Sequence, residues 1–179
     1  QGEAEARCNW SLLAYLRGDC AVALDYGQRA LALSRELGDR PNQAYALTRL
    51  GMVHAEQGNF SQAATAYHRA LTLRLELDSP HMVMETRAGL ARLYVLQDDL
   101  DQAQAQVEHI LSHLCTNTLD GTDEPFRIYL TCYRVLRANQ DPRAAEVLGT
   151  AYRLLQEQAA RIKDTTRRRS FLEDVDVHR

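Results

Sequence analysis

Two histidines four residues apart, His109 and His113, have the spacing in this sequence that best suits metal chemistry. On a helix, residues i and i+4 share one face, so both imidazoles could reach the same ion. No Glu or Cys completes such a site, and a similar stretch elsewhere in the chain carries Arg29 or Arg69 at the position of His109. We therefore expect two histidines in solvent, and neither a bound metal nor another cofactor.

Carboxylates gather twice, at residues 98–101 and 120–124, without the D-x-D-x-D-G order of a calcium loop. Helix capping and a solvated loop account for them. The sequence also lacks the phosphate loops G-x-x-x-x-G-K and G-x-G-x-x-G and the nucleophile turn G-x-S-x-G. We therefore predict no catalytic residues and expect a protein that is not an enzyme.

A basic cluster lies near the C-terminus and consists of Arg161, Lys163, Arg167, Arg168 and Arg169. It could contact phosphate or an acidic partner. Alternatively, a final helix packs by Phe171 and Leu172 on the end of the fold and turns its charges to solvent. The net charge of -3 argues against nucleic acid. No apolar run is long enough to span a membrane.

The elements that position these residues repeat every 40 residues, as the alignment of Ala23, Ala63 and Ala103 shows. Between turns, apolar residues recur at intervals of three and four, which is the helical period. A turn such as Gly58-Asn59 divides each unit into two helices, and we expect prolines such as Pro80 to end each unit. A single helical hairpin cannot bury its apolar face, so successive hairpins must stack.

In the second copy of the repeat, the characteristic positions are occupied by Leu47, Leu50, Gly51, Ala63, Tyr67, Ala70 and Pro80. They resemble the tetratricopeptide repeat family, whose usual period is about 34 residues. The resemblance implies an all-α, right-handed superhelical solenoid of about four stacked hairpins plus a C-terminal capping helix. The predicted repeats cover residues 3–40, 43–80, 83–116 and 124–162, the last in a slipped register, and the capping helix covers residues 165–174.

The resemblance also implies that the first helix of each hairpin lines a concave groove that binds a protein or peptide. The candidate groove residues are Leu12, Tyr15, Tyr45, Thr48, Arg49, Met52, Arg92 and Val95. Apolar side chains mixed with arginines suit a partly hydrophobic segment that carries an acidic residue or two. Alternatively, Met52 and Val95 only pack between adjacent copies.

These observations favour a non-catalytic, cytoplasmic scaffold that serves as the sensor or interaction region of a larger regulator. Residues 154–179 resemble the end of the repeat region in bacterial multidomain regulators, and the absence of an initiator Met suggests an excised fragment. Cysteines without C-x-x-C spacing favour reduced thiols in the cytosol. The alternatives are a receptor for a small signalling peptide, a regulatory fragment of a nucleotide-dependent enzyme, and self-association through the exposed N-terminal hairpin.

Overall fold

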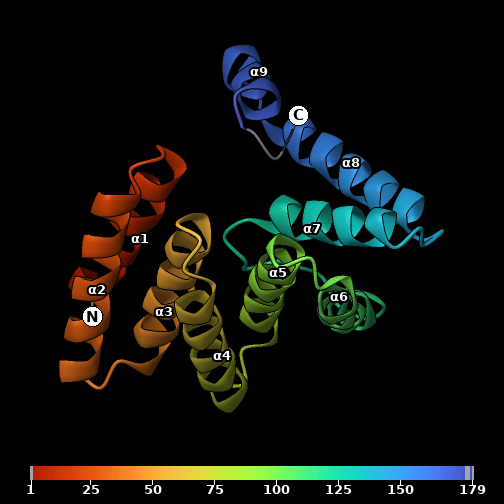
Figure 1. Ribbon diagram of the computed structural model, residues 1–179. Helices are drawn as coiled ribbons and strands as arrows, with labels where there is room; N and C mark the ends of the chain where they lie inside the picture. The colour runs from red at the N-terminus through yellow and green to blue at the C-terminus, as the bar shows by residue number, and fades with distance from the viewer. Residues whose placement is uncertain (1, 176–177, 179) are drawn as a thin grey trace.

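The computed structural model describes residues 2–175 and 178, and within these residues the chain forms nine α-helices and no strands. Eight helices pair as consecutive hairpins, and the first three of these hairpins stand side by side (Figure 1). They are α1 (Gly2–Leu16) with α2 (Cys20–Glu36), α3 (Arg40–Glu56) with α4 (Phe60–Glu76), α5 (Pro80–Leu96) with α6 (Leu100–Leu114), and α7 (Pro125–Ala138) with α8 (Ala144–Arg161). The ninth helix, α9 (Thr165–Glu173), follows α8. The predicted all-α helical repeat solenoid is therefore confirmed.

The turns inside the hairpins are built from the residues that the sequence suggests. Gly18 and Gly58 take φ angles of 79° and 75°, and Asp98 takes 58° at the matching place in the third hairpin. This left-handed backbone ends the first helix. The next helix starts at once: the Asp99 side chain, for example, accepts a hydrogen bond of 3.1 Å from the backbone N–H of Gln102.

The prolines begin helices, which corrects the expectation that they end units. Pro41 and Pro80 lie in the first turns of α3 and α5. These helices start at residues 40 and 80, three residues before the predicted repeat starts at 43 and 83. Proline is tolerated there because the first backbone N–H groups of a helix have no partner within that helix.

Close packing between hairpins depends on an aromatic ring that lies against glycines. The Tyr67 side chain is almost completely buried. A Cβ atom placed on Gly51 would lie 2.9 Å from the Tyr67 ring, and one on Gly89 would lie 2.5 Å from it. Tyr67 thus fills the space that two glycines of the neighbouring first helices leave open.

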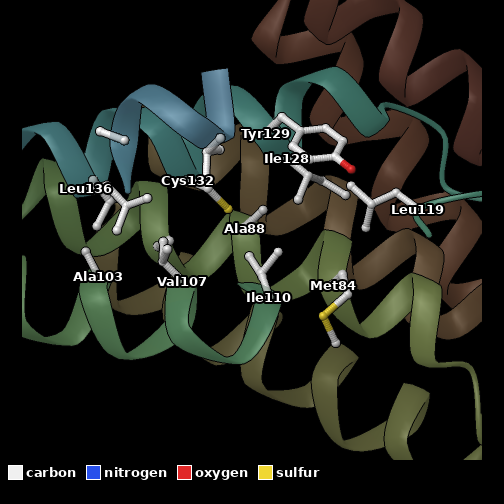
Figure 2. Close-up of a cluster of buried hydrophobic side chains, with 14 of the residues drawn as sticks. Met84, Ala88, Ala103, Val107, Ile110, Leu119, Ile128, Tyr129, Cys132 and Leu136 are labelled. Atoms are coloured by element: carbon white, nitrogen blue, oxygen red, sulfur yellow. The ribbon is translucent and has the colours of Figure 1, made fainter. Parts of the chain in front are cut away.

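The fourth hairpin departs from the regular stack because α7 runs across the end of α5 and α6 (Figure 1). Figure 2 shows the buried side chains that join them, with Cys132 and Leu136 of α7 facing Ala88 of α5 and Val107 of α6. Leu119, from the segment between α6 and α7, is buried in the same cluster. This anchoring places the start of α7 over the first helices of the earlier hairpins.

The C-terminal helix α9 packs less tightly than the sequence suggests, because none of its residues is fully buried. Phe171 and Leu172 are half-buried, and the ring centroids of Phe171 and His178 lie 4.4 Å apart. In the basic cluster, Arg168 donates to the Ile162 carbonyl oxygen and Arg169 pairs with Glu173 at 3.2 Å. No described helix is long and apolar enough to cross a membrane.

Candidate protein-binding groove

The candidate groove residues of α1, α3 and α5 differ widely in exposure. Val95 is 37% exposed and remains at the surface. Four others are half-buried, namely Leu12, Tyr15, Tyr45 and Arg92. Three are buried, namely Thr48, Arg49 and Met52. A binding role for these eight residues stays a prediction, but their positions show which of them line open space.

Arg49 already holds two carboxylates of the chain itself. Its side chain is 2% exposed, and its guanidinium lies 3.2 Å from Glu85 and also contacts Asp123, which comes from the segment before α7. Glu85 in turn lies 3.3 Å from Arg74 of α4. The Tyr45 ring lies beside both guanidiniums. Its centroid is 5.9 Å from the Cζ atom of Arg49 and 5.3 Å from the Cζ atom of Arg74.

The charges of this buried group balance one another at neutral pH. Burial by itself would raise the pKa of Glu85, but Arg49 and Arg74 outweigh it and hold this pKa below its ordinary value. Burial lowers the pKa of Arg74. Burial and then Glu85 raise the pKa of Asp123, despite its contact with Arg49. The group therefore joins α3, α4 and α5 to the segment before α7 as an internal support.

An open groove remains between α1, α3, α5 and α7. Its outer part is a cavity of about 640 Å³ and its inner part a cavity of about 280 Å³. Both parts are lined by Tyr15, Glu56, Arg92, Arg127, Thr131 and Arg134. The inner part has an apolar floor made of Met52, Ala55, Leu93, Val95, Leu96 and Val135.

Three arginines border the inner part of the groove. Arg92 donates to the Thr131 hydroxyl oxygen at 3.0 Å, and burial lowers the pKa of Arg92. Arg127 pairs with Glu124 at 3.0 Å and donates to the Tyr15 hydroxyl oxygen at 3.1 Å. Arg134 is exposed and forms no ion pair with any residue that the structure describes.

The balance of charge differs between the two parts of the groove. The inner part is lined by the three arginines and a single carboxylate, Glu56. The outer part is lined by the same arginines, but Glu124 and Asp174 join Glu56 there. A carboxylate of a ligand would therefore be favoured in the inner part, beside the apolar floor.

The sequence prediction included Arg92, Tyr15 and Met52 but missed the contribution of α7. The fourth copy is shifted relative to the 40-residue register, so its groove positions could not be read from the alignment of the earlier copies. The spacing of Arg127, Thr131 and Arg134, at i, i+4 and i+7, places them on one helix face and was the available signal.

In the part of the chain that is described, the histidines and cysteines belong to no candidate metal site. No group of three His, Cys, Asp or Glu side chains could hold a metal ion there. His109 is exposed, and a ring nitrogen of His113 lies 3.2 Å from the Thr118 carbonyl oxygen. All four cysteines are free thiols; Cys8 and Cys132 are buried, Cys20 is half-buried and Cys115 is exposed.

Comparison with known proteins gives a family for the first part of the chain and a fold for nearly all of it. The family model described as tetratricopeptide repeat matches residues 2–76. No curated protein matches the chain. Among solved structures, BtubC (BKLC) from P. vanneervenii superposes with a TM-score of 0.65 at 24% identity, over 87% of this chain and 65% of that chain.

Two structures of a Podosopora anserina protein, described as kinesin light chain with nearly identical TPR-like repeats, superpose equally well. One is a point variant with a TM-score of 0.65 at 13% identity, covering 86% of this chain and 74% of that chain. The other has a TM-score of 0.65 at 12% identity, covering 97% and 79%. The chain thus spans a little less than two thirds of the length of BtubC.

Tetratricopeptide repeats are generally scaffolds for protein interaction. The family match covers the first two hairpins, and the structural similarity extends the same helical repeat fold over most of the remaining helices. Residues 2–76 therefore match the tetratricopeptide repeat family, and the chain as a whole shares the helical repeat fold of these solved structures.

Proposed function

We propose that this chain is a non-catalytic scaffold module whose inner groove binds an acidic, partly apolar segment of a partner protein. The observation that supports the proposal is the lining of the inner groove, where Arg92, Arg127 and Arg134 face a single carboxylate, Glu56, above an apolar floor.

The three guanidiniums favour a carboxylate because each presents several N–H donors in a fixed plane. Arg92 is half-buried and uses one hydrogen bond to Thr131, which leaves donors for a ligand. An apolar side chain next to that carboxylate would lie over Met52 and Leu93 and would gain about 25 cal/mol for each Å² of apolar surface removed from water.

In this proposal Arg49 does not contact the partner directly. Its guanidinium is held by Glu85 and Asp123. Arg49 therefore stabilises the packing of α3, which carries Met52, against α5 and the segment before α7. Arg127 and Arg134 take the direct role that the sequence analysis predicts for Arg49.

Selection from a displayed random peptide library would test the proposal, followed by affinity measurement with a synthetic copy of a selected peptide. We expect selected peptides to combine Asp or Glu with apolar residues. Arg134→Glu should weaken binding about 10-fold or more, because a hydrogen bond to a charged group contributes about 1.5–3 kcal/mol. Arg137→Glu, which changes another exposed arginine of α7 that does not line this groove, is the matched control.

Three results would contradict the proposal. Selected peptides could lack carboxylates altogether, or Arg134→Glu could bind the acidic peptide as tightly as the unaltered chain. Loss of affinity in the Arg137→Glu control would show that the groove is not the place of binding.

A receptor for a short signalling peptide is the second candidate, because the outer cavity of about 640 Å³ has the size of a small-ligand pocket. Progressive shortening of a selected peptide distinguishes the two. A short peptide receptor keeps its affinity down to a few residues, whereas a scaffold groove loses affinity with each truncation. In either case we place the module in a larger cytosolic regulator, because residues 154–179 resemble the end of the repeat region in such regulators. Sequencing of the coding region on either side of this chain tests the placement.

A further inference from the structure

The outer face of the first hairpin exposes apolar side chains in a continuous stripe. Ala6, Trp10 and Leu13 follow one side of α1, at intervals of four and three residues. Trp10 is 53% exposed and Leu13 is 37% exposed. The Trp10 ring stacks on Tyr26 of α2 with centroids 6.2 Å apart, so the indole is held in place on this face.

The later hairpins bury the same stripe. The residues that lie 40 positions further along are Ala46, Leu50 and Val53, and those 80 positions further are Thr86, Leu90 and Leu93; all six are buried. Leu50 lies against α2, since a Cβ atom on Gly27 would be 2.9 Å from its Cδ2 atom, and Val53 packs with Ala14 and Ala23. The stripe of α1 therefore occupies a position that a neighbouring hairpin covers elsewhere in the molecule.

Among the described helices, α1 and α2 stand at one end of the row (Figure 1), and their outer face presents the sole tryptophan of the chain. A helical partner that covers the exposed half of the Trp10 side chain would gain about 25 cal/mol for each Å² of apolar surface removed from water.

The charges at the two ends of the stripe identify the partner that fits. Glu3 and Arg17 lie seven residues before and seven residues after Trp10. Arg17 is the first residue after α1, but its backbone N–H still donates to the Leu13 carbonyl oxygen at 3.2 Å, so the three positions follow about the same side of the helix. Two copies of α1 packed antiparallel about Trp10 would bring Glu3 of each copy opposite Arg17 of the other. We propose that this face joins two copies of the chain in a twofold-symmetric dimer centred on Trp10.

The sole tryptophan makes the proposal directly measurable by sedimentation velocity and tryptophan emission over a range of chain concentrations. We expect dimers to form as concentration rises, together with a blue shift of the emission as the indole leaves water. Trp10→Glu should be monomeric at every concentration with an unchanged far-ultraviolet circular dichroism spectrum. The matched control is Tyr152→Glu, which alters an aromatic residue that is 64% exposed on α8 and should still dimerise.

A charge exchange tests the antiparallel arrangement. Glu3→Arg alone and Arg17→Glu alone should each weaken the dimer, and the two together should restore it, because the charges then match again across the twofold axis. Since Glu3 also pairs with Arg7 within α1, at 2.6 Å, Arg7→Gln serves as a control that removes only the internal pair.

Each other outcome would overturn the proposal. A monomer at all concentrations would leave the face to a further helical hairpin of another protein or another segment. A dimer that survives Trp10→Glu would have to use a different surface. A dimer that ignores the charge exchange would exclude the antiparallel arrangement about Trp10.

Discussion

Glu85 lies between Arg49 and Arg74, and the side chains of all three residues are almost completely buried. Isolated charges are costly inside a protein, so these three depend on one another and on Asp123. The Tyr45 ring beside both guanidiniums adds a cation–π attraction. Residues that the sequence suggests as ligands for a partner thus form part of the interior.

Removing the charge of Glu85 should therefore destabilise the fold strongly. We expect Glu85→Gln to lower the free energy of unfolding at pH 7 by about 3 kcal/mol, because it leaves two buried guanidiniums short of a carboxylate. Urea denaturation measures this. The control is Glu76→Gln, which alters a half-exposed pair with Arg40 and should cost less than about 1 kcal/mol. Equal effects of the two changes would contradict the structural role of Glu85.

The difference in free energy of unfolding between the unaltered chain and Glu85→Gln should depend on pH. The pKa of Glu85 in the folded chain lies below its ordinary value of 4.5. Its stabilisation is therefore complete above about pH 4.5 and is lost as the pH falls through the folded pKa. The free energies of unfolding of the unaltered chain and of Glu85→Gln should therefore become more alike in acid. Asp123, whose pKa is raised, acts in the opposite sense, so Asp123→Asn should make the acid loss steeper.

At the level of helices, the fit between hairpins depends on how closely α4 and α5 approach. Gly89 lies inside α5, where a Cβ atom would be 2.5 Å from the Tyr67 ring. Alanine favours helix over glycine by about 1 kcal/mol. At position 89 this gain is outweighed, because the buried ring of Tyr67 has little room to move.

We expect Gly89→Ala to destabilise the chain by about 1–3 kcal/mol, as overpacked cores do. Gly149 of α8 is the matched control, because nothing lies within 4 Å of a Cβ atom placed there. Gly149→Ala should leave stability unchanged or raise it by about 0.5–1 kcal/mol. Thermal unfolding of both variants measures the contrast, and a stabilised Gly89→Ala would show that the ring can shift.

The helices themselves follow from the sequence, because the 40-residue period fixes both the helical spacing and the turns at Gly18, Gly58 and Asp98. Half of the groove follows as well, through Tyr15 and Arg92. The burial of Arg49 does not, because Asp123 reaches it from 74 residues further along the chain. Contacts of that kind depend on how the slipped fourth hairpin docks, which the regular period does not encode.

Across the whole molecule, a contact between the first and fourth hairpins links two helices that line the groove. Arg127 of α7 donates to the Tyr15 hydroxyl oxygen of α1 at 3.1 Å, although the two residues are 112 positions apart. The Arg127 guanidinium also lies 5.4 Å from the centroid of the Tyr15 ring. In a solenoid each hairpin normally touches only its neighbours, so this contact ties together ends that could otherwise separate.

Cutting the contact should therefore open the molecule without unfolding it. We expect Arg127→Ala to increase the maximum dimension measured by small-angle X-ray scattering and to speed amide hydrogen exchange in the first turn of α7. Tyr15→Phe, which keeps the ring under the guanidinium and loses only the hydroxyl, should have a smaller effect. Arg153→Ala removes an exposed pair with Glu157 that lies within α8 and joins no two helices, so it should leave the dimension unchanged. If Arg127→Ala scatters like the unaltered chain, the docking of Leu119 and α7 on α5 and α6 is enough to hold α7 in place.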